Sequence, residues 1–145
     1  MLEEHEGKRD YAYTDVNGKW HIGIGRNIDA DGGLGLSDDE IDMLLDNDIV
    51  RTIKELTGEF PWFPKLDEVR ADALIQIAFN LGLTRLRKFK RALMAMQNAI
   101  EKADDSFFGI AKIEFLDSIW STQVGQRAVT LSTMIETGQY PDGYD

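Results

Sequence analysis

The sequence predicts an α+β fold with a small β-containing N-terminal lobe, a long linking helix and a helical C-terminal lobe. Three observations predict it: β-prone residues and glycine turns gather in residues 7–37, an amphipathic helical pattern begins at residue 38, and helical patterns separated by Gly or Pro fill residues 58–145. The 145 residues, 43% of them hydrophobic, are enough for a single domain over residues 1–145 with one core.

In the N-terminal lobe, residues 2–6 are predicted to form a short helix that ends at Gly7. Residues 11–28 have the composition of strands, since aromatic residues alternate there with small or polar ones. Residues 16–19, Val-Asn-Gly-Lys, predict a hairpin turn because an Asn-Gly pair tolerates the positive φ of a tight turn. Residues 20–25 are then the returning strand.

The linking helix has a clear start signal after a predicted loop at residues 29–36. Ser37 and Glu40 have the spacing of a capping box, in which each side chain binds a backbone N–H of the other residue. Apolar residues at helical spacing follow, and the helix is predicted to run over residues 38–57 and to end at Gly58.

The C-terminal lobe is predicted to be entirely helical. Its apolar stripes recur at helical spacing, and glycines at positions 82 and 138 are placed to end two of its helices. The expected helices cover residues 69–81, 89–100, 105–117 and 123–137. The helix at residues 1–6 is expected to pack on this lobe.

Composition limits the possible partners. The chain carries 26 acidic and 16 basic residues, a net charge of −10, which repels nucleic acids and anionic membranes. It has no cysteine and only two histidines, so we expect no metal and no cofactor. No apolar run is long enough to span a membrane, and the N-terminus does not resemble a signal peptide, so we expect synthesis in a cytoplasm and no stable membrane insertion.

Two acids and one imidazole near the N-terminus form the candidate site: Glu6, Asp15 and His21. Hydrolysis of a glycosidic bond needs one proton donor and one group on the other face of the sugar, and these side chains can supply both. Taken singly, each has a simpler interpretation: Glu6 as a solvated acid, Asp15 as a turn cap, and His21 as an exposed strand residue.

The spacing of these residues resembles that of a known family. Glu6 is separated by eight residues from Asp15 and by five more from His21, and an Ile-Gly-x-Gly run follows at residues 22–25. This pattern is similar to that of the phage-type lysozymes, the muramidases of glycoside hydrolase family 24. The resemblance covers essentially the whole chain, including the segments at residues 44–49, 73–82 and 120–128.

The resemblance implies a lysozyme-like fold with an active-site cleft between the lobes, and it implies roles for individual residues. Glu6 is the expected proton donor and Asp15 the second carboxylate, which places water or stabilises developing positive charge. Arg127 is expected to pair with Glu6 and orient it. Phe79 and Asn80 are expected at the floor of the cleft, where substrate binds.

Other residues are expected to have structural roles. We interpret Phe89 and Trp120 as core residues. Arg26 is expected to pair with Asp48.

Two features depart from the family pattern. The loop at residues 27–36 is short, so the small lobe is expected to lack a helix there. His21 stands where the family has Thr, and an imidazole can accept a proton or attack the anomeric carbon itself. Inversion, retention and formation of an anhydro product therefore remain open.

The main functional hypothesis is a peptidoglycan hydrolase: a lysozyme that cleaves the β-1,4 bond between N-acetylmuramic acid and N-acetylglucosamine. A lytic transglycosylase and a non-catalytic glycan-binding or structural domain on the same fold are the alternatives. We expect a monomer whose partners are peptidoglycan glycan strands. As a phage protein, it would be located in the host cytoplasm before lysis, or in the virion.

Overall fold

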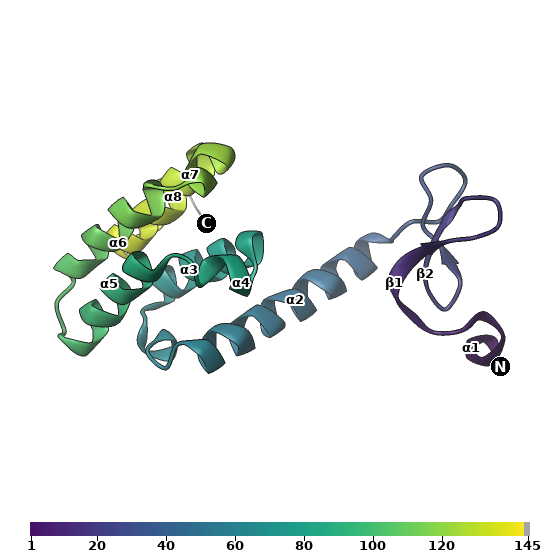
Figure 1. Cartoon of the computed structure of the whole chain (residues 1–145), viewed down its shortest axis with the longest axis horizontal. Coiled ribbons are helices and arrows are strands. Elements are labelled where there is room, and N and C mark those ends of the chain that lie inside the picture. Colours follow the sequence, from purple (N-terminus) through teal and green to yellow (C-terminus); the bar gives the residue numbers. More distant parts are fainter. Residues whose placement is uncertain (144–145) are drawn as a thin grey trace. The chain divides into compact units, whose positions relative to one another are not determined.

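The computed structural model describes residues 1–143, apart from the side chain of Glu6. It divides into two compact units, Met1–Asp46 and the residues from Asn47 onward. The boundary falls within the long helix α2 (Asp38–Glu59), which Figure 1 labels. The structure is mixed α+β, which confirms the predicted fold class. The predicted single-domain organisation, with the first helix packed on the helical lobe, remains a prediction.

The first unit contains helix α1 and a three-stranded antiparallel sheet in the order β1-β2-β3. The elements are α1 (Leu2–Glu6), β1 (Arg9–Thr14), β2 (Trp20–Gly23) and β3 (Arg26–Asn27). The predicted short helix is confirmed, and so is the concentration of strands in residues 7–37.

The hairpin between β1 and β2 turns where the sequence predicts. The N–H of Gly18 donates to the carbonyl of Asp15 over 3.0 Å, and Gly18 has a φ of 77°. Among the described residues only Ala103 combines a side chain with positive φ, so Asn17 does not adopt the left-handed region. The glycine alone supplies the turn's special geometry. The resulting register places Tyr13 opposite His21.

The returning strand is shorter than predicted. β2 ends at Gly23, and the chain then reverses into β3, which pairs His21 with Asn27 and Ile22 with Arg26. The prediction of one strand through residue 25 is therefore wrong at its end. A two-residue strand such as β3 has no periodicity of its own and depends on its neighbour for definition.

The capping box at the start of α2 is confirmed. The Glu40 carboxylate accepts from the N–H of Ser37 at 3.0 Å, and the Ser37 hydroxyl accepts from the N–H of Glu40 at 3.2 Å. Residues 28–37 contain no helix, as expected from the short loop. The helix continues to Glu59, two residues beyond the predicted end, because Gly58 keeps a helical conformation.

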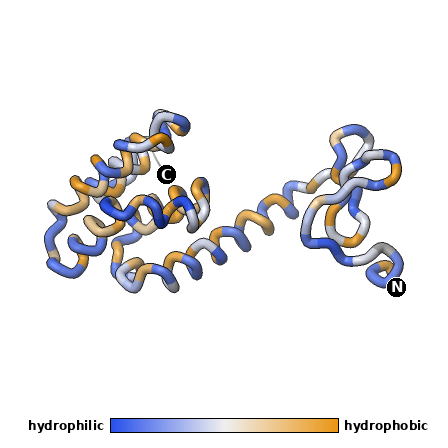
Figure 2. Tube along the Cα trace, viewed as in Figure 1, coloured by the Kyte–Doolittle hydropathy of each residue, from blue (hydrophilic) through white to orange (hydrophobic). Residues whose placement is uncertain are grey.

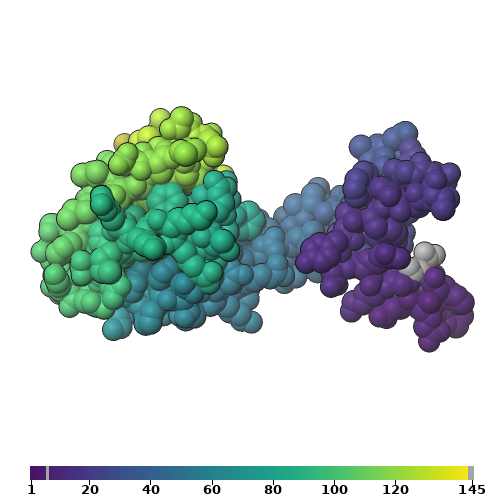
Figure 3. All heavy atoms as spheres, in the orientation of Figure 1, coloured from purple at the N-terminus to yellow at the C-terminus, as the bar shows by residue number. Residues whose placement is uncertain are grey.

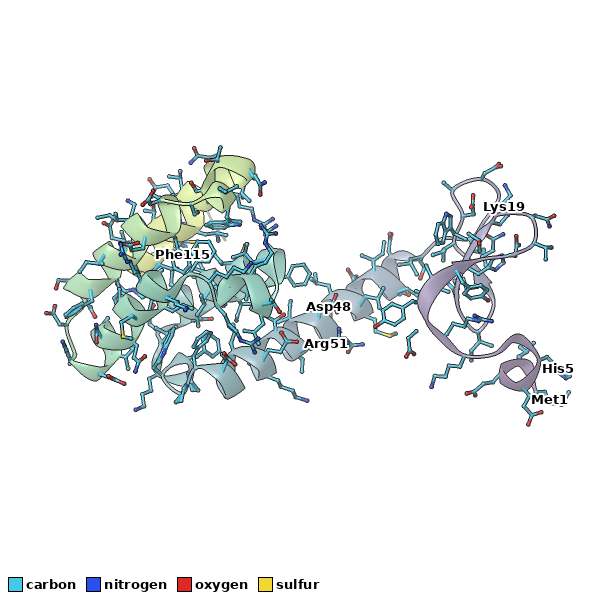
Figure 4. The ribbon with its side chains drawn as sticks, viewed as in Figure 1. Met1, His5, Lys19, Asp48, Arg51 and Phe115 are labelled. Carbon is cyan, nitrogen blue, oxygen red and sulfur yellow. The ribbon has the colours of Figure 1, made fainter. Side chains whose placement is uncertain are left out.

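The predicted pair between Arg26 and Asp48 is wrong. Arg26 Nη1 donates instead to Glu40 at 2.5 Å and to the carbonyl of Gly35 at 3.2 Å, so it ties the loop to the start of α2. Asp48 lies 3.5 Å from Arg51, one turn further along the same helix; Figure 4 labels both. Gly35 and Glu40 are both nearer to Arg26 in sequence than Asp48, the predicted partner.

The second unit is helical. Its elements are η1 (Phe63–Lys65), α3 (Glu68–Leu81), α4 (Leu83–Leu86), α5 (Lys90–Glu101), α6 (Ser106–Leu116), α7 (Ile119–Val124) and α8 (Gln126–Thr137). Three predicted helices are confirmed to within a residue at each end. The predicted helix at 123–137 is divided at Gly125, and the short α4 was not predicted.

The core of this unit lies where α6 packs against α5 and α8, and where α3 packs against α8. Its largest fully buried apolar side chains are Phe108, Phe115, Leu56, Leu74, Ile77, Leu86, Met96 and Ile135. Trp120 is only 3% exposed, and the ring of Phe89 packs against those of Phe115 and Trp120. The predicted core role of Phe89 and Trp120 is confirmed. Figure 2 shows apolar and polar segments alternating along α2, the pattern of an amphipathic helix.

Two further properties concern the described residues. Within residues 1–143, no helix is both long and apolar enough to cross a bilayer. In the same part of the chain, no group of three or more His, Asp or Glu residues has the arrangement of a metal site.

Candidate active site

The β1–β2 hairpin brings Asp15 and His21 together. Asp15 Oδ2 lies 2.8 Å from His21 Nε2, and the two side chains are 31% and 16% exposed. The hairpin explains this contact, because Asp15 follows β1 directly and His21 is the second residue of β2. The prediction that these residues lie within a few ångströms is confirmed, and the alternative in which the ring points into solvent is wrong.

Asp15 also caps its own turn. Its Oδ1 accepts from the N–H of Asn17 at 2.8 Å and from the N–H of Lys19 at 3.0 Å. The N–H of Lys19 is the largest cause of a lowered pKa at Asp15, followed by the hydrogen bond from His21. The interpretation of Asp15 as a turn cap is confirmed: one oxygen holds the turn, and the other contacts the imidazole. Its role as the second carboxylate stays a prediction. The lowered pKa keeps the carboxylate ionised to more acidic pH.

The imidazole of His21 is held from two further sides. Its Nδ1 lies 3.3 Å from the carbonyl oxygen of Gly25, and its ring stacks on Tyr13 with centroids 5.7 Å apart and planes 26° apart. The guanidinium of Arg9 covers the Tyr13 ring at 4.6 Å. Sequence reasoning missed this support, although the predicted turn position would already place Tyr13 opposite His21.

These contacts restrict the chemistry of His21. A carboxylate and a carbonyl can only accept hydrogen bonds, so donation to both partners requires a proton on each ring nitrogen. That form of the ring is an imidazolium, and neither of its nitrogens carries a lone pair. The arrangement therefore suits an ion pair with Asp15, and a role as base or nucleophile requires the loss of one of these protons.

Asp29 was also missed by the sequence analysis. Its Oδ2 accepts from the N–H of Trp20, the first residue of β2, at 3.0 Å, and its Oδ1 accepts from the N–H of Asp31 at 2.9 Å. These bonds lower the pKa of Asp29, with the Asp31 N–H the largest cause. Asp29 thus anchors the strand one residue before His21.

The predicted proton donor is only partly described. Glu6 is the last residue of α1, and the N–H of Gly7 donates to the Glu3 carbonyl at 2.9 Å as the helix ends. The Glu6 side chain lies outside the described part of the structure. Its predicted pairing with Arg127 therefore stays a prediction.

The remaining predicted site residues belong to the second unit. Arg127 is exposed near the start of α8, and no described side chain pairs with it. Phe79, near the end of α3, is 48% exposed, which is uncommon for a phenylalanine and leaves its ring available to a ligand.

Asn80 is exposed but already has a structural partner. Its Oδ1 accepts from the indole N–H of Trp120 at 2.8 Å, which links the end of α3 to α7. An indole N–H can only donate, so the amide oxygen must face the tryptophan and the amide N–H₂ must point away. Asn80 can therefore hold Trp120 and still donate to a ligand.

The structure is mixed α+β, with a carboxylate–imidazole pair on the hairpin of its first unit. Residues 3–114 match the model of the phage lysozyme family. This match covers more than half of the chain, and the chain therefore belongs to the phage lysozyme family. Membership supports activity as a lysozyme-like peptidoglycan hydrolase.

Two similar proteins come from Dictyostelium discoideum. The chain is 26% identical to a probable T4-type lysozyme 2 and 23% identical to a probable T4-type lysozyme 1. In each case the match covers 95% of this chain and 92% of the relative. The similarity therefore extends over nearly the full length of both proteins.

Proposed function

We propose that this protein hydrolyses the β-1,4 bond between N-acetylmuramic acid and N-acetylglucosamine in peptidoglycan. The observation that carries the proposal is the Asp15 carboxylate, held ionised beside His21, with Glu6 nine residues upstream at the end of α1. Membership of the phage lysozyme family supports the same reaction class. A purely glycan-binding domain has no need for a proton donor paired with a second carboxylate, the pattern of Glu6 and Asp15.

In the proposed mechanism Glu6 is the general acid. It protonates the oxygen of the leaving sugar as the glycosidic bond breaks, and positive charge develops on the anomeric carbon. Asp15 stabilises that charge, or orients the attacking water, from the opposite side of the sugar. Because its pKa is lowered, Asp15 keeps its negative charge to more acidic pH than an ordinary aspartate does.

His21 acts, in this proposal, as a positioning residue for Asp15. Its Nε2 is occupied by Asp15 and its Nδ1 by Gly25, so both nitrogens are engaged before substrate arrives. His21 is then not the nucleophile, and we propose that water, oriented by Asp15, attacks the anomeric carbon with inversion. A covalent role for His21 would predict retention, and a transglycosylase reaction would give a 1,6-anhydro product without water.

The substrate and location follow from the same proposal. Glycan strands of the bacterial wall are the partner, the protein acts as a monomer, and no metal or cofactor takes part. We propose synthesis in a host cytoplasm, followed by action on the wall as a free endolysin or from a virion.

The test is digestion of purified peptidoglycan, followed by mass spectrometry of the released muropeptides. The parent should release reducing-end disaccharide peptides. Glu6→Gln keeps the size of the side chain but removes the transferable proton, and should lower the rate at least about a hundredfold. Glu4→Gln, in the same helix, is the matched control and should retain the parent rate. Near-parent activity of Glu6→Gln would show that the acid is wrongly assigned.

A further inference from the structure

The distribution of charge along the chain is uneven. No Asp or Glu occurs in residues 73–100, although acids outnumber bases in the chain as a whole. The same segment holds five basic residues within one short stretch: Arg85, Arg87, Lys88, Lys90 and Arg91. A cationic region of this kind in a protein of net charge −10 is not explained by solubility, which favours an excess of one sign.

Four of these cations line one pocket of about 580 Å³ on the second unit. Arg87 does not line this pocket; its guanidinium instead pairs with the Glu59 carboxylate at 2.7 Å. The remaining four, which are exposed and form no ion pair within the described residues, are Arg85, Lys88, Lys90 and Arg91. The teal segment that contains α4 and the start of α5 lies on the face of this unit drawn in Figure 3. The volume is in the usual range for ligand-binding pockets.

The start of α5 adds a second, independent observation. The helix begins with Lys90 and Arg91, its N-cap residue is Phe89, no side chain caps its first turn, and that turn holds no acid. The N-terminus of a helix carries partial positive charge and unpaired N–H groups, so two cations there are unfavourable. Local arrangements that violate such a rule are typical of functional sites, and a bound anion would relieve this one.

Two acids limit which anions fit. Glu114 and Asp117 also line the pocket, so one isolated negative charge meets attraction and repulsion together. A ligand with several closely spaced negative charges can contact all four cations, and this attraction can outweigh the repulsion from the two acids. Two of the four are arginines, whose planar guanidinium groups bind the oxygens of a phosphate in pairs.

We propose that this pocket, whose lining includes none of the residues assigned to glycan cleavage, binds the phosphodiester chain of a polyol-phosphate wall polymer. The choice of a wall polymer rests on the proposed function, whereas the preference for a phosphate chain rests on the pocket itself. Binding there would hold the enzyme on phosphate-bearing walls in spite of its net negative charge.

The pocket is poorly suited to single-stranded nucleic acid, the other common phosphodiester chain. Proteins that bind single strands stack the bases on exposed aromatic rings. The aromatic residues that line this pocket are Phe89 and Trp120; Trp120 is 3% exposed, and Phe89 is packed against Phe115. Trp120 is therefore too buried to stack on a base, and Phe89 is only partly exposed.

The test is binding of short poly(glycerol phosphate) chains to the full-length protein by isothermal titration calorimetry at low salt. A fourfold variant in which Arg85, Lys88, Lys90 and Arg91 become Gln should bind at least about tenfold more weakly, with a smaller dependence on salt. The matched control changes four exposed lysines elsewhere, Lys8, Lys54, Lys65 and Lys102, to Gln, so that net charge changes equally. It should bind like the parent, and circular dichroism should show both variants folded.

Each outcome decides the proposal. Equal weakening in the two variants would reduce the effect to net charge and overturn the site, and so would the absence of binding by the parent. Tighter binding of a single-stranded oligonucleotide of equal charge would overturn the choice of polymer. Glycan cleavage is measured separately on peptidoglycan stripped of phosphate polymers, where the pocket variant should match the parent. A protein that binds the polymer but cleaves no glycan would refute the proposed function and leave the pocket site intact.

Discussion

Asp15 Oδ2 and His21 Nε2 lie 2.8 Å apart across a single hairpin, while Asp15 Oδ1 accepts two backbone N–H groups of the turn between them. One carboxylate therefore both shapes the hairpin and contacts the imidazole. A mutation can test these two roles separately. Capping the turn requires only an acceptor oxygen, whereas the proposed catalytic role requires a negative charge.

We expect Asp15→Asn to retain the turn and lose activity. The Asn Oδ1 can still accept from the N–H groups of Asn17 and Lys19, so the hairpin should fold. The lost negative charge should slow glycan cleavage by about 10² to 10³, the usual cost of removing an electrostatic stabiliser of a transition state. Asp31→Asn, which removes the exposed partner of Lys19, is the control and should leave the rate unchanged. A fully active Asp15→Asn would exclude a charge-dependent role.

The acid stability of the protein should depend on Asp15. The pKa of this carboxyl is lowered below its ordinary 3.8, first by the Lys19 N–H and then by His21. A lowered folded-state pKa gives stability that is present above the unfolded pKa and is lost as the pH falls through the folded one. Urea unfolding at a series of pH values below about 5 should therefore show a shallower loss of stability for Asp15→Asn than for the parent. An identical pH profile would contradict this.

Asn80 should show separate structural and substrate-binding effects. Asn80→Ala leaves the indole N–H of Trp120 without its acceptor and should cost about 1–3 kcal/mol of unfolding free energy. Asn80→Asp keeps the acceptor and should stay close to the parent in stability. Both variants lose the amide N–H₂, so both should raise KM for soluble glycan if Asn80 binds substrate. An unchanged KM in both would restrict Asn80 to the support of Trp120.

The C-terminal end of α8 depends on a glycine. Gly138 has a φ of 68°, and a Cβ there would lie 2.9 Å from Arg70 Nη1. The buried Arg70 donates to the carbonyls of Ile135 and Glu136, the last turn of α8, so it cannot move away freely. Gly138→Ala should lower the unfolding free energy by more than about 1 kcal/mol.

Gly58 provides the matched control for this substitution. It lies within α2 at helical φ, and nothing would contact its Cβ. Gly58→Ala should raise stability by up to about 1 kcal/mol, since alanine favours helix. Opposite shifts of the two thermal midpoints are therefore expected, and a neutral Gly138→Ala would show that Arg70 can rearrange.

Features encoded by neighbouring residues were predicted well. The capping box of Ser37 and Glu40, the Gly18 turn and the helix end at Gly138 each depend on a few consecutive side chains and backbone groups. Their physical causes are local, and a single sequence contains them completely.

Features that depend on distant partners were missed. The hydrogen bond from Trp120 to Asn80 joins residues 40 positions apart, and Arg70 reaches carbonyls 65 and 66 positions away. Arg26 was assigned the wrong acid because several carboxylates lie within its reach in sequence, and only the folded loop selects Glu40. The contact of Asp15 with His21 was predictable because one hairpin carries both residues.

The final prediction concerns the stereochemical role of His21. If both ring nitrogens remain bound to Asp15 and Gly25 during the reaction, His21 is not the nucleophile. With water as the proposed nucleophile, the first-formed product should have the inverted, α configuration. Proton NMR of the anomeric signals during the first minutes of digestion measures this directly. His21→Thr should keep the same product configuration and change the rate by less than about tenfold, because threonine removes a support of Asp15 but no reacting group. His5→Thr, at the exposed second histidine on α1, is the control and should behave as the parent. A retained β product from the parent, replaced by an inverted one in His21→Thr, would instead establish His21 as a covalent nucleophile. In that case His21 would have to release its hydrogen bond to Asp15 and bond to the anomeric carbon in each catalytic cycle.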